Sequence, residues 1–535
     1  MDGEKRLDSG TAAAVEAAEA ERFRTLQAGL AEQYSTVFAD QHLHRTIVVL
    51  PSLTLDTEVL SKITGAIHYE QRSLCLLMLL RYPNARVIYL SSDPVPEAIV
   101  DYYLHLLPGI PGDHARSRLT LLACHDTSPR PLVEKVLERP RMIERIRAAM
   151  GDPAHTHMTC FNVCAAERRL ALALGIPIYG CDPDLLPIGS KSGSRHVFRE
   201  AGLDLPDGVE DLADAKDLGE ALVALKSRNA ASARAVVKLN DGFSGDGNAI
   251  FRFPAEMDAG TLRARMPDLL PAMDFVAEGM SWDRFEAKFV EMGGIAEIFV
   301  EGDVKESPSV QFRIDPAGRL ETVSTHDQIT GGAAGQVFHG CRFPAHADYR
   351  LDIQASGKRA AEVLRRRGVL GRFGIDFISV RDGGRWRHFA VEINLRKGGT
   401  THPYQMLQFL TDGTFDEETG TYLGSGGRPL YYYASDNLQA PHYRGLTPDD
   451  LIDIVVDNGL HFHTATQEGV VFHLIGALSE YGKLGLVCVA GSEGGAAELY
   501  NQTVGVLDRE GRRSTGGSLD EKGPAPANGT GHSYV

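Results

Sequence analysis

One segment constrains the fold of this chain more than any other, the stretch GRFGIDFISVRDGGRWRHFAVEINLRKGGTTHP at residues 371–403. Residues 375–380 and 386–394 are both typical of β-strands, and the letters RDGGR between them form a hairpin signal. Because neighbouring strands joined by so short a turn run antiparallel, the segment predicts a β-hairpin with its turn centred near Gly384.

Two acids and an amide share one face of this expected hairpin. The turn sets Asp376 directly across from Glu392, and Asn394 lies two residues further along on the same face. Carboxylate and amide oxygens at this density suit Mg²⁺, and two like charges so close are unfavourable unless a cation lies between them. The alternative is a solvated charge pair on an edge hairpin. Both acids lie inside otherwise apolar strands, where unpaired acids are rare, so we expect the metal site.

A second candidate site is the glycine-containing loop in VVKLNDGFSGDGNAIF, residues 236–251. A β-branched strand delivers Lys238, and Gly242, Gly245 and Gly247 follow before another strand begins. Glycines let backbone N–H groups approach phosphate oxygens closely, and the lysine supplies a positive charge. The loop is not a P-loop, because a strand rather than a helix follows it. A glycine-rich hairpin without a ligand is the alternative.

The first part of the chain alternates strands with helices. Strands are expected at 46–53, 85–92 and 118–124, with helices between them and a further strand and helix before Gly175. This order predicts a parallel sheet with helices on its faces. The sequence after Leu50 lacks G-x-G-x-x-G, so no dinucleotide site is expected there.

The remaining chain is expected to be organised differently. Over residues 190–410 strands are joined by glycine-containing turns, with helices at 192–201 and 353–367. Residues 411–429 are poor in hydrophobic side chains and are expected to form a loop or linker. A small α/β unit is expected at 430–508.

Charge and composition exclude several classes of protein. The net charge is −16 and there is no basic block, so the chain is not expected to bind nucleic acid. No stretch approaches the roughly 20 apolar residues of a membrane span, and the first residues lack the apolar core of a secretory signal. The seven cysteines are an odd number and lie mostly in apolar segments, which favours reduced thiols. We therefore expect a cytoplasmic protein that does not bind membranes.

Lys238 with its glycine loop, followed later by the D-x15-E-x-N pattern of residues 376–394, resembles the ATP-grasp superfamily. Within it, the chain is similar to the pheganomycin-type peptide ligases over roughly residues 45–500, and EINLRKGGTTHP is the most specific part. The resemblance implies an α/β and α+β fold, with a pre-ATP-grasp parallel α/β domain, a two-lobed ATP-grasp fold and a small C-terminal α/β domain. The expected ranges are 1–44 for an N-terminal helical extension, 45–188, 189–412 and 430–508 for the three domains, and 511–535 for a disordered tail.

The resemblance also implies how ATP is held. Lys238 would contact the α- and β-phosphates, and Lys191 would match an earlier phosphate-binding lysine, although Ser190 stands where many relatives have Asp. Glu306 would hold the ribose, with Glu301 as the alternative. Glu297 would accept a hydrogen bond from the adenine amino group, and the backbone of Phe299 and Val300 would pair with the ring. The implied nucleotide-binding set is Lys191, Lys238, Gly242, Ser244, Gly245, Gly247, Glu297, Phe299, Val300 and Glu306.

The chemical step has its own implied residues. Asp376, Glu392 and Asn394 would be the metal ligands for two Mg²⁺ ions, with Mn²⁺ as an alternative metal. Arg396 would stabilise developing charge, and Arg313 would contact the acyl phosphate.

Other polar residues are left without a catalytic role. Related ligases place an arginine two residues before the metal aspartate, but Gly374 stands there and Arg372 lies two residues earlier. Residues 155–164 contain two histidines and two cysteines, but the spacing matches no familiar zinc site and a structural role is favoured. His402 is a candidate for the acceptor side of the site, and the small residues 331–335 for a mobile lid.

The expected activity is that of an ATP-dependent carboxylate–amine ligase, a peptide ligase of natural product biosynthesis. ATP would phosphorylate a small, amino-acid-derived carboxylic acid, and the amine of an amino acid or peptide would displace phosphate from the acyl phosphate to form an amide, leaving ADP and phosphate. The alternatives are an ATP-grasp ligase for a non-peptide acid or amine, and an ATP-binding regulatory module without turnover. The carboxylase branch shares the E-x-N-x-R spacing but ranks low without a biotin-carrier segment, and a homo-oligomer is left open.

Overall fold

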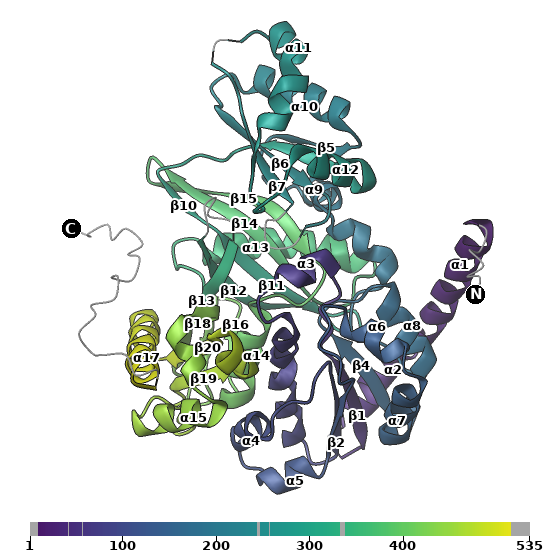
Figure 1. Ribbon diagram of the computed structural model, residues 1–535, viewed down its shortest axis with the longest axis vertical. Coiled ribbons are helices and arrows are strands. Elements are labelled where there is room, and N and C mark those ends of the chain that lie inside the picture. The colour runs from purple at the N-terminus through teal and green to yellow at the C-terminus, as the bar shows by residue number, and fades with distance from the viewer. Residues whose placement is uncertain are drawn as a thin grey trace.

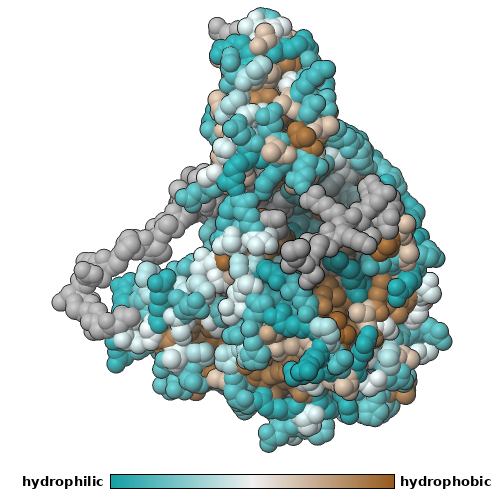
Figure 2. All heavy atoms as spheres, turned by 45° about the vertical axis from the view of Figure 1, so that its right-hand side comes forward, coloured by the Kyte–Doolittle hydropathy of each residue, from teal (hydrophilic) through white to brown (hydrophobic). Residues whose placement is uncertain are grey.

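The computed structural model describes residues 9–40, 42–55, 57–242, 247–255, 257–331 and 337–514. An N-terminal α/β domain, a projecting small lobe and a large antiparallel sheet are arranged around a common centre (Figure 1). In the space-filling view the small lobe rises as a narrow column above a broader body, and hydrophilic residues cover most of the visible surface (Figure 2). None of the helices in the described ranges has the length and apolar character needed to cross a bilayer.

The N-terminal domain is built on a four-stranded parallel sheet with the order β3-β2-β1-β4. Its central strand β1 is buried at every position because helices cover both faces of the sheet, which confirms the expected parallel arrangement. The expected helix at 71–80 is a longer 3₁₀ helix, η2. The elements are α1 (Ser9–Ala28), α2 (Leu30–Gln33), the π-helical η1 (Tyr34–Phe38), β1 (Arg45–Leu50), α3 (Thr57–Lys62), η2 (Ala66–Arg81), β2 (Ala85–Ser91), α4 (Glu97–His105), α5 (Gly112–Arg116), β3 (Leu119–Ala123), α6 (Leu132–Leu137), α7 (Pro140–Met150), η3 (Pro153–His155), β4 (Thr156–Cys160), α8 (Ala165–Leu174) and η4 (Pro183–Gly189).

The small lobe is a five-stranded sheet with the order β5-β9-β6-β7-β8, covered by helices α10 and α12. Strand β6 carries Lys238 on the buried side of the lobe's edge toward the body. The elements are α9 (Lys191–Glu200), β5 (Gly208–Leu212), α10 (Ala215–Arg228), β6 (Arg234–Leu239), β7 (Asn248–Arg252), α11 (Ala259–Leu269), η5 (Leu270–Ala272), β8 (Asp274–Phe275), α12 (Trp282–Met292) and β9 (Gly294–Ile298).

The large sheet has the order β10-β14-β11-β12-β13-β18-β17-β16, with β15 paired to β14, and β20 paired to β18 and β19. Helix α13 packs against β11 and β14 through an apolar core. The elements are β10 (Val304–Glu306), β11 (Pro308–Ile314), β12 (Leu320–Gly331), β13 (Val337–Phe343), α13 (Arg350–Arg366), β14 (Gly371–Asp382), β15 (Arg385–Asn394), α14 (Thr401–Thr411), β16 (Thr414–Asp416), β17 (Thr421–Leu423), β18 (Pro429–Gln439), η6 (Pro441–Gly445), α15 (Pro448–Asp457), β19 (Gly469–His473), η7 (Ile475–Ala477), α16 (Leu478–Tyr481), β20 (Lys483–Ala490) and α17 (Glu493–Ser514).

Three features of the C-terminal part differ from expectation. Residues 411–429 are not a linker: β16 and β17 form a short hairpin there, and β17 pairs with β18. The unit at 430–508 is joined to the large lobe, because β18 pairs antiparallel with β13 and extends the same sheet. Helix α17 continues to Ser514, so residues 511–514 are helical, and the rest of the expected tail lies outside the described residues.

Candidate active site

A cavity of about 360 Å³ lies where the small lobe, the large sheet and the N-terminal domain meet. Most of the residues proposed from the sequence line it, although they come from distant parts of the chain. They are Lys191, Lys238, Gly242, Gly247, Glu297, Phe299, Val300, Asp376, Glu392, Asn394 and Arg396. We refer to this cavity as the cleft.

The acidic hairpin has the predicted register. Asp376 on β14 faces Glu392 on β15, and Asn394 is two residues further along the same strand. The Nδ2 of Asn394 donates to Oδ2 of Asp376 at 2.9 Å, and the Nε2 of Gln328 on β12 donates to Oδ1 at 2.9 Å. These contacts hold the Asp376 carboxylate in one orientation at the cleft wall.

Two lysines meet the acids of the cleft. Lys191 Nζ forms an ion pair with Oε1 of Glu392, and Lys238 Nζ lies 2.5 Å from Oε1 of Glu297. Lys191 begins helix α9, and the Ser190 hydroxyl caps that helix by accepting from the Gly193 N–H at 3.0 Å. Serine and aspartate are both good N-cap residues, so serine at this position retains the local function of the aspartate found in relatives.

The two acids of the hairpin have opposite electrostatic environments. Burial and the neighbouring Glu392 carboxylate raise the pKa of Asp376 above its ordinary value. Burial alone would raise the pKa of Glu392 as well, but Lys191 and Arg396 lower it. Without a further cation the pair is therefore only partly compensated, because Lys191 contacts one of the two carboxylates.

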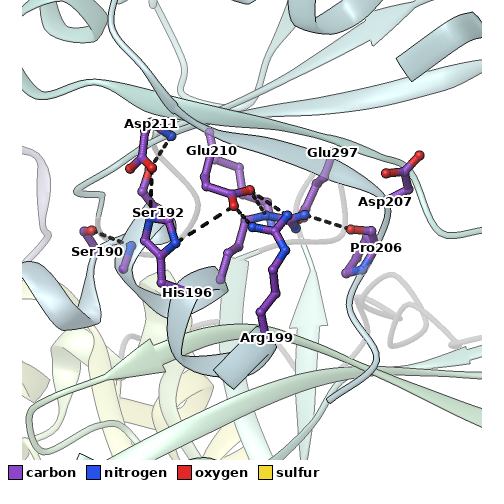
Figure 3. A network of polar contacts seen from close by, with 12 residues as sticks. Ser190, Ser192, His196, Arg199, Pro206, Asp207, Glu210, Asp211 and Glu297 are labelled. Atoms are coloured by element: carbon purple, nitrogen blue, oxygen red, sulfur yellow. Dashed lines mark hydrogen bonds and ion pairs between the residues drawn. The ribbon is translucent and has the colours of Figure 1, made fainter. Parts of the chain in front are cut away.

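Glu297 is fixed by a buried polar network at the base of the small lobe. Arg195 NH1 donates to Oε2 of Glu297 at 2.9 Å, and both side chains are almost completely buried. Arg195 Nε also donates to Glu210, which Arg199 contacts from the other side; Figure 3 shows Arg199 pointing toward Glu210, beside Glu297. Both Glu297 oxygens are thus occupied by cations, and the network locks the strand that leads to Phe299.

The segment after β9 forms an aromatic and cationic wall of the cleft. The guanidinium of Arg234 and the ammonium of Lys305 each lie 4.0 Å from the centre of the Phe299 ring. Phe299 and Val300 both line the cleft, at the connection between the two lobes. A planar ring could pack here beside backbone groups, as the adenine assignment requires.

Two residues proposed from the sequence do not line the cleft. Arg313 lies two residues beyond the cleft-lining Gln311 on β11, and it pairs with Glu321 at 2.5 Å in a different cavity. Glu306 is adjacent to Lys305 on β10, and because side chains alternate along a strand it faces the opposite side, near Asp327.

The other assignments within the loops have separate outcomes. The alternative ribose residue, Glu301, pairs with Arg234 at 2.6 Å and does not line the cleft. Ser244 and Gly245 lie outside the described residues, as do residues 332–335 of the suggested lid.

Sequence reasoning missed the end of the cleft that faces the N-terminal domain. Arg72 NH1 lies 3.1 Å from Oδ2 of Asp436, and both side chains are more than nine-tenths buried. The Arg72 guanidinium also lies over the rings of Tyr69 and Phe161, at 4.4 and 5.1 Å from their centres. Arg72 and Asp436 are 364 positions apart, so no local pattern could have linked them.

The histidines noted in the sequence are structural in their contacts. His157 packs edge-on against Phe38, with ring centres 4.5 Å apart. His402 shares a 2.8 Å hydrogen bond with His473 and is buried behind the cleft wall rather than lining it. Within the described ranges, no three His, Cys, Asp or Glu side chains are placed to hold a metal ion by themselves.

Comparison with known proteins identifies the family. The chain is 30% identical over 498 residues to the L-propargylglycine–L-glutamate ligase of Streptantibioticus cattleyicolor, covering 91% of this chain and 96% of that protein. The IQCH-like ATP-grasp family matches residues 187–260 and 261–418, and the PGM1 C-terminal domain matches residues 450–503. The chain belongs to the ATP-grasp superfamily.

Other ATP-grasp relatives and structures agree with this assignment at the level of fold. The chain is 24% identical over 422 residues to the IQ motif-containing protein H of Danio rerio, covering 70% of this chain but 40% of that protein. Biotin carboxylase of Campylobacter jejuni has a TM-score of 0.52 at 12% identity, covering 88% of this chain and 95% of that one. The biotin carboxylase domain of the Hydrogenobacter thermophilus 2-oxoglutarate carboxylase also has a TM-score of 0.52, at 11% identity, covering 86% and 89%.

Proposed function

We propose that this protein uses ATP to activate the carboxylate of an amino-acid-derived acid and joins it to the amine of an amino acid or short peptide. Its family reaction is the ATP-dependent ligation of a carboxylate to an amine. The observation that carries the proposal is the convergence of Asp376, Glu392, Asn394, two lysines and Arg396 on one cleft.

The hairpin acids suit Mg²⁺. Their donors are carboxylate and amide oxygens, and Mg²⁺ in nucleotide sites typically takes one or two carboxylates and completes its coordination with phosphates and waters. The raised pKa of Asp376, caused by burial and by Glu392, is the sign of a carboxylate pair that lacks a cation. Asp376, Glu392 and Asn394 would hold Mg²⁺, which supplies neutralisation of phosphate charge when bound.

The protein's own cations would position the reacting groups. Lys191, Lys238 and Arg396 line the same cleft as the acids, so they can orient phosphate oxygens and the substrate carboxylate. In the present structure Lys191 and Lys238 pair with Glu392 and Glu297, which keeps both ammonium groups at the cleft surface. Each lysine is thus already close to where a phosphate would have to lie.

The Arg72–Asp436 pair supports amino-acid substrates. An amino acid carries a carboxylate and an ammonium group, and the two partners of this pair have the complementary charges. The pair lines the cleft at the end away from Phe299, beside Phe161 and Thr400. We propose that Arg72 receives a substrate carboxylate and Asp436 a substrate ammonium.

The test is a release assay with the full chain, ATP, Mg²⁺ and defined pairs of amino acids, L-propargylglycine with L-glutamate among them. ADP that is released only when acid and amine are both present, with an amide product found by mass spectrometry, supports the proposal. AMP release indicates adenylation chemistry instead. Tight ATP binding without turnover indicates a regulatory module.

A further inference from the structure

A second cavity of about 430 Å³ lies behind the active-site wall. It is enclosed by the N-terminal helical segment with Leu30 and Tyr34, by the strand ends at Ile47 and Thr159, and by helix α14. Its volume is within the range of small-molecule sites, which is about 300–1,000 Å³. We refer to it as the rear cavity.

The rear cavity has an excess of positive charge. Its cationic lining residues are Arg45, Arg81, Arg313, Arg372 and Lys397, whereas Asp412 is the single acid among its described lining residues. Asp412 pairs with Arg81 at 2.5 Å and is largely exposed, and Arg313 pairs with Glu321 from outside the lining. Such an excess stands out in a chain whose net charge is −16.

Arg372 is the least compensated of these cations. It forms no ion pair or hydrogen bond with any residue in the described ranges, and it lies directly opposite Arg313 in the pairing of β11 with β14. Like charges placed opposite each other on neighbouring strands are destabilising. Burial and Arg313 accordingly lower the pKa of the Arg372 guanidinium.

Two neutral groups of the same lining are also unsatisfied. The Tyr179 hydroxyl and His157 Nδ1 are buried and have no hydrogen-bond partner in the described part of the chain, and His157 is 92% buried. Buried polar groups nearly always have a partner, so a cluster of unsatisfied groups in one cavity is evidence for a ligand.

From this cluster we infer that the rear cavity is a second ligand site, for a small molecule that carries a carboxylate on an apolar or aromatic body. A carboxylate matches the forked donors of Arg372 and the ammonium of Lys397. Aromatic and aliphatic walls, among them Tyr34, Phe38 and Phe409, match an apolar body, which a free phosphate lacks.

The rear cavity is mechanically connected to the cleft. Arg396 lines the cleft, and the next residue, Lys397, lines the rear cavity. The Lys397 backbone N–H donates to the Phe161 carbonyl at 3.1 Å, and its Nζ donates to Oγ1 of Thr159 at 2.7 Å. A ligand that draws Lys397 away from Thr159 therefore acts on the segment that carries Arg396, so occupancy of the rear cavity modulates the ligase reaction; this coupling rests on the proposed function, whereas binding does not.

Calorimetric titration of the full chain, saturated with Mg²⁺ and a non-hydrolysable ATP analogue, tests the inference with N-acetyl-L-phenylalanine as the probe. Arg372→Gln should weaken its binding at one site by at least about tenfold, the effect of one lost charge-assisted hydrogen bond. Arg381→Gln, an exposed arginine on the same strand, is the matched control and should bind like the wild type. Equal binding by wild type and Arg372→Gln overturns the inference, and so does inorganic phosphate that binds as tightly as the probe and displaces it.

Two further variants separate this site from the cleft and from folding effects. Arg72→Gln should leave the Arg372-dependent binding in place, because Arg72 lies in the cleft. If the proposed function is wrong, the release assay fails while the Arg372-dependent binding remains. Arg372→Gln should unfold at the same temperature as the wild type or higher, since it removes an uncompensated cation, and a clear drop would show a structural role and overturn the inference.

Discussion

Strand β14 carries two charged residues four positions apart in opposite environments. Asp376 enters the cleft, where Lys191 and Arg396 lie close to it and two amides hold its oxygens. Arg372 enters the rear cavity, where its nearest charged neighbour is another arginine. The difference teaches that the charges of the cleft are arranged around a nucleotide and its metal, whereas those of the rear cavity still lack an anion.

Metal removal should have the largest effect on the cleft. Chelation with EDTA is expected to abolish ADP release, because the phosphate charge and the Asp376–Glu392 pair would both lose their cation. Readdition of Mg²⁺ should restore the rate. Full activity in EDTA would remove the distinction between the two ends of β14.

Neutralising one metal carboxylate comes next. Glu392→Gln should lower turnover by roughly 10²-fold or more, the scale of one preorganised electrostatic contact. Glu362→Gln, an exposed acid on α13 that pairs with Arg365, is the control and should retain wild-type turnover. A Glu392→Gln enzyme that keeps more than half of its activity would contradict the metal assignment.

The substrate end of the cleft gives a smaller effect. Arg72→Gln should raise KM for the amino acid that supplies the carboxylate by about tenfold or more, with KM for ATP unchanged. The variant should also be less stable by about 3–5 kcal/mol, because Asp436 is left buried without its partner. Combining Arg72→Met with Asp436→Leu should recover stability in urea unfolding but not KM. An unchanged amino-acid KM in Arg72→Gln would exclude the pair from substrate binding.

The smallest expected effect is a pH dependence of stability from the rear cavity. Burial, opposed by Cys160 and reinforced by Arg372, lowers the pKa of Lys397 to about 8, below its ordinary value of 10.5. The unfolded chain then binds more protons between these two values, so the free energy of unfolding should rise with pH through that window, by about 1–3 kcal/mol. Lys397→Met should lose this increment in urea unfolding at pH 7.5 and 10. An equal rise in both proteins would assign the effect to other groups.

The sequence predicted best what is local. The register of Asp376 with Glu392 follows from a short turn and strict alternation, and the structure has that register. The parallel order of the first sheet follows equally from the alternation of strands and helices. Motif residues such as Lys238 could be recognised because one short segment contains both the lysine and its glycines.

Errors occurred where a position depended on the path of a strand or on distant parts of the chain. Glu306 was proposed for the ribose, but a difference of one residue on β10 places Lys305, not Glu306, at the cleft. Arg313 lies on the expected strand but too far along it, because strand length relative to the cleft is not written in local sequence. Gln328 and Arg72 contact residues 48 and 364 positions away, and tertiary folding alone brings them together.

The most direct test of the central claim is a crystal structure of the full chain with Mg²⁺ and a non-hydrolysable ATP analogue. The account predicts the triphosphate in the cleft, with Asp376 and Glu392 oxygens about 2.0–2.1 Å from a metal ion that also contacts phosphate. A nucleotide bound elsewhere, or metal ions that these two carboxylates do not contact, would contradict it.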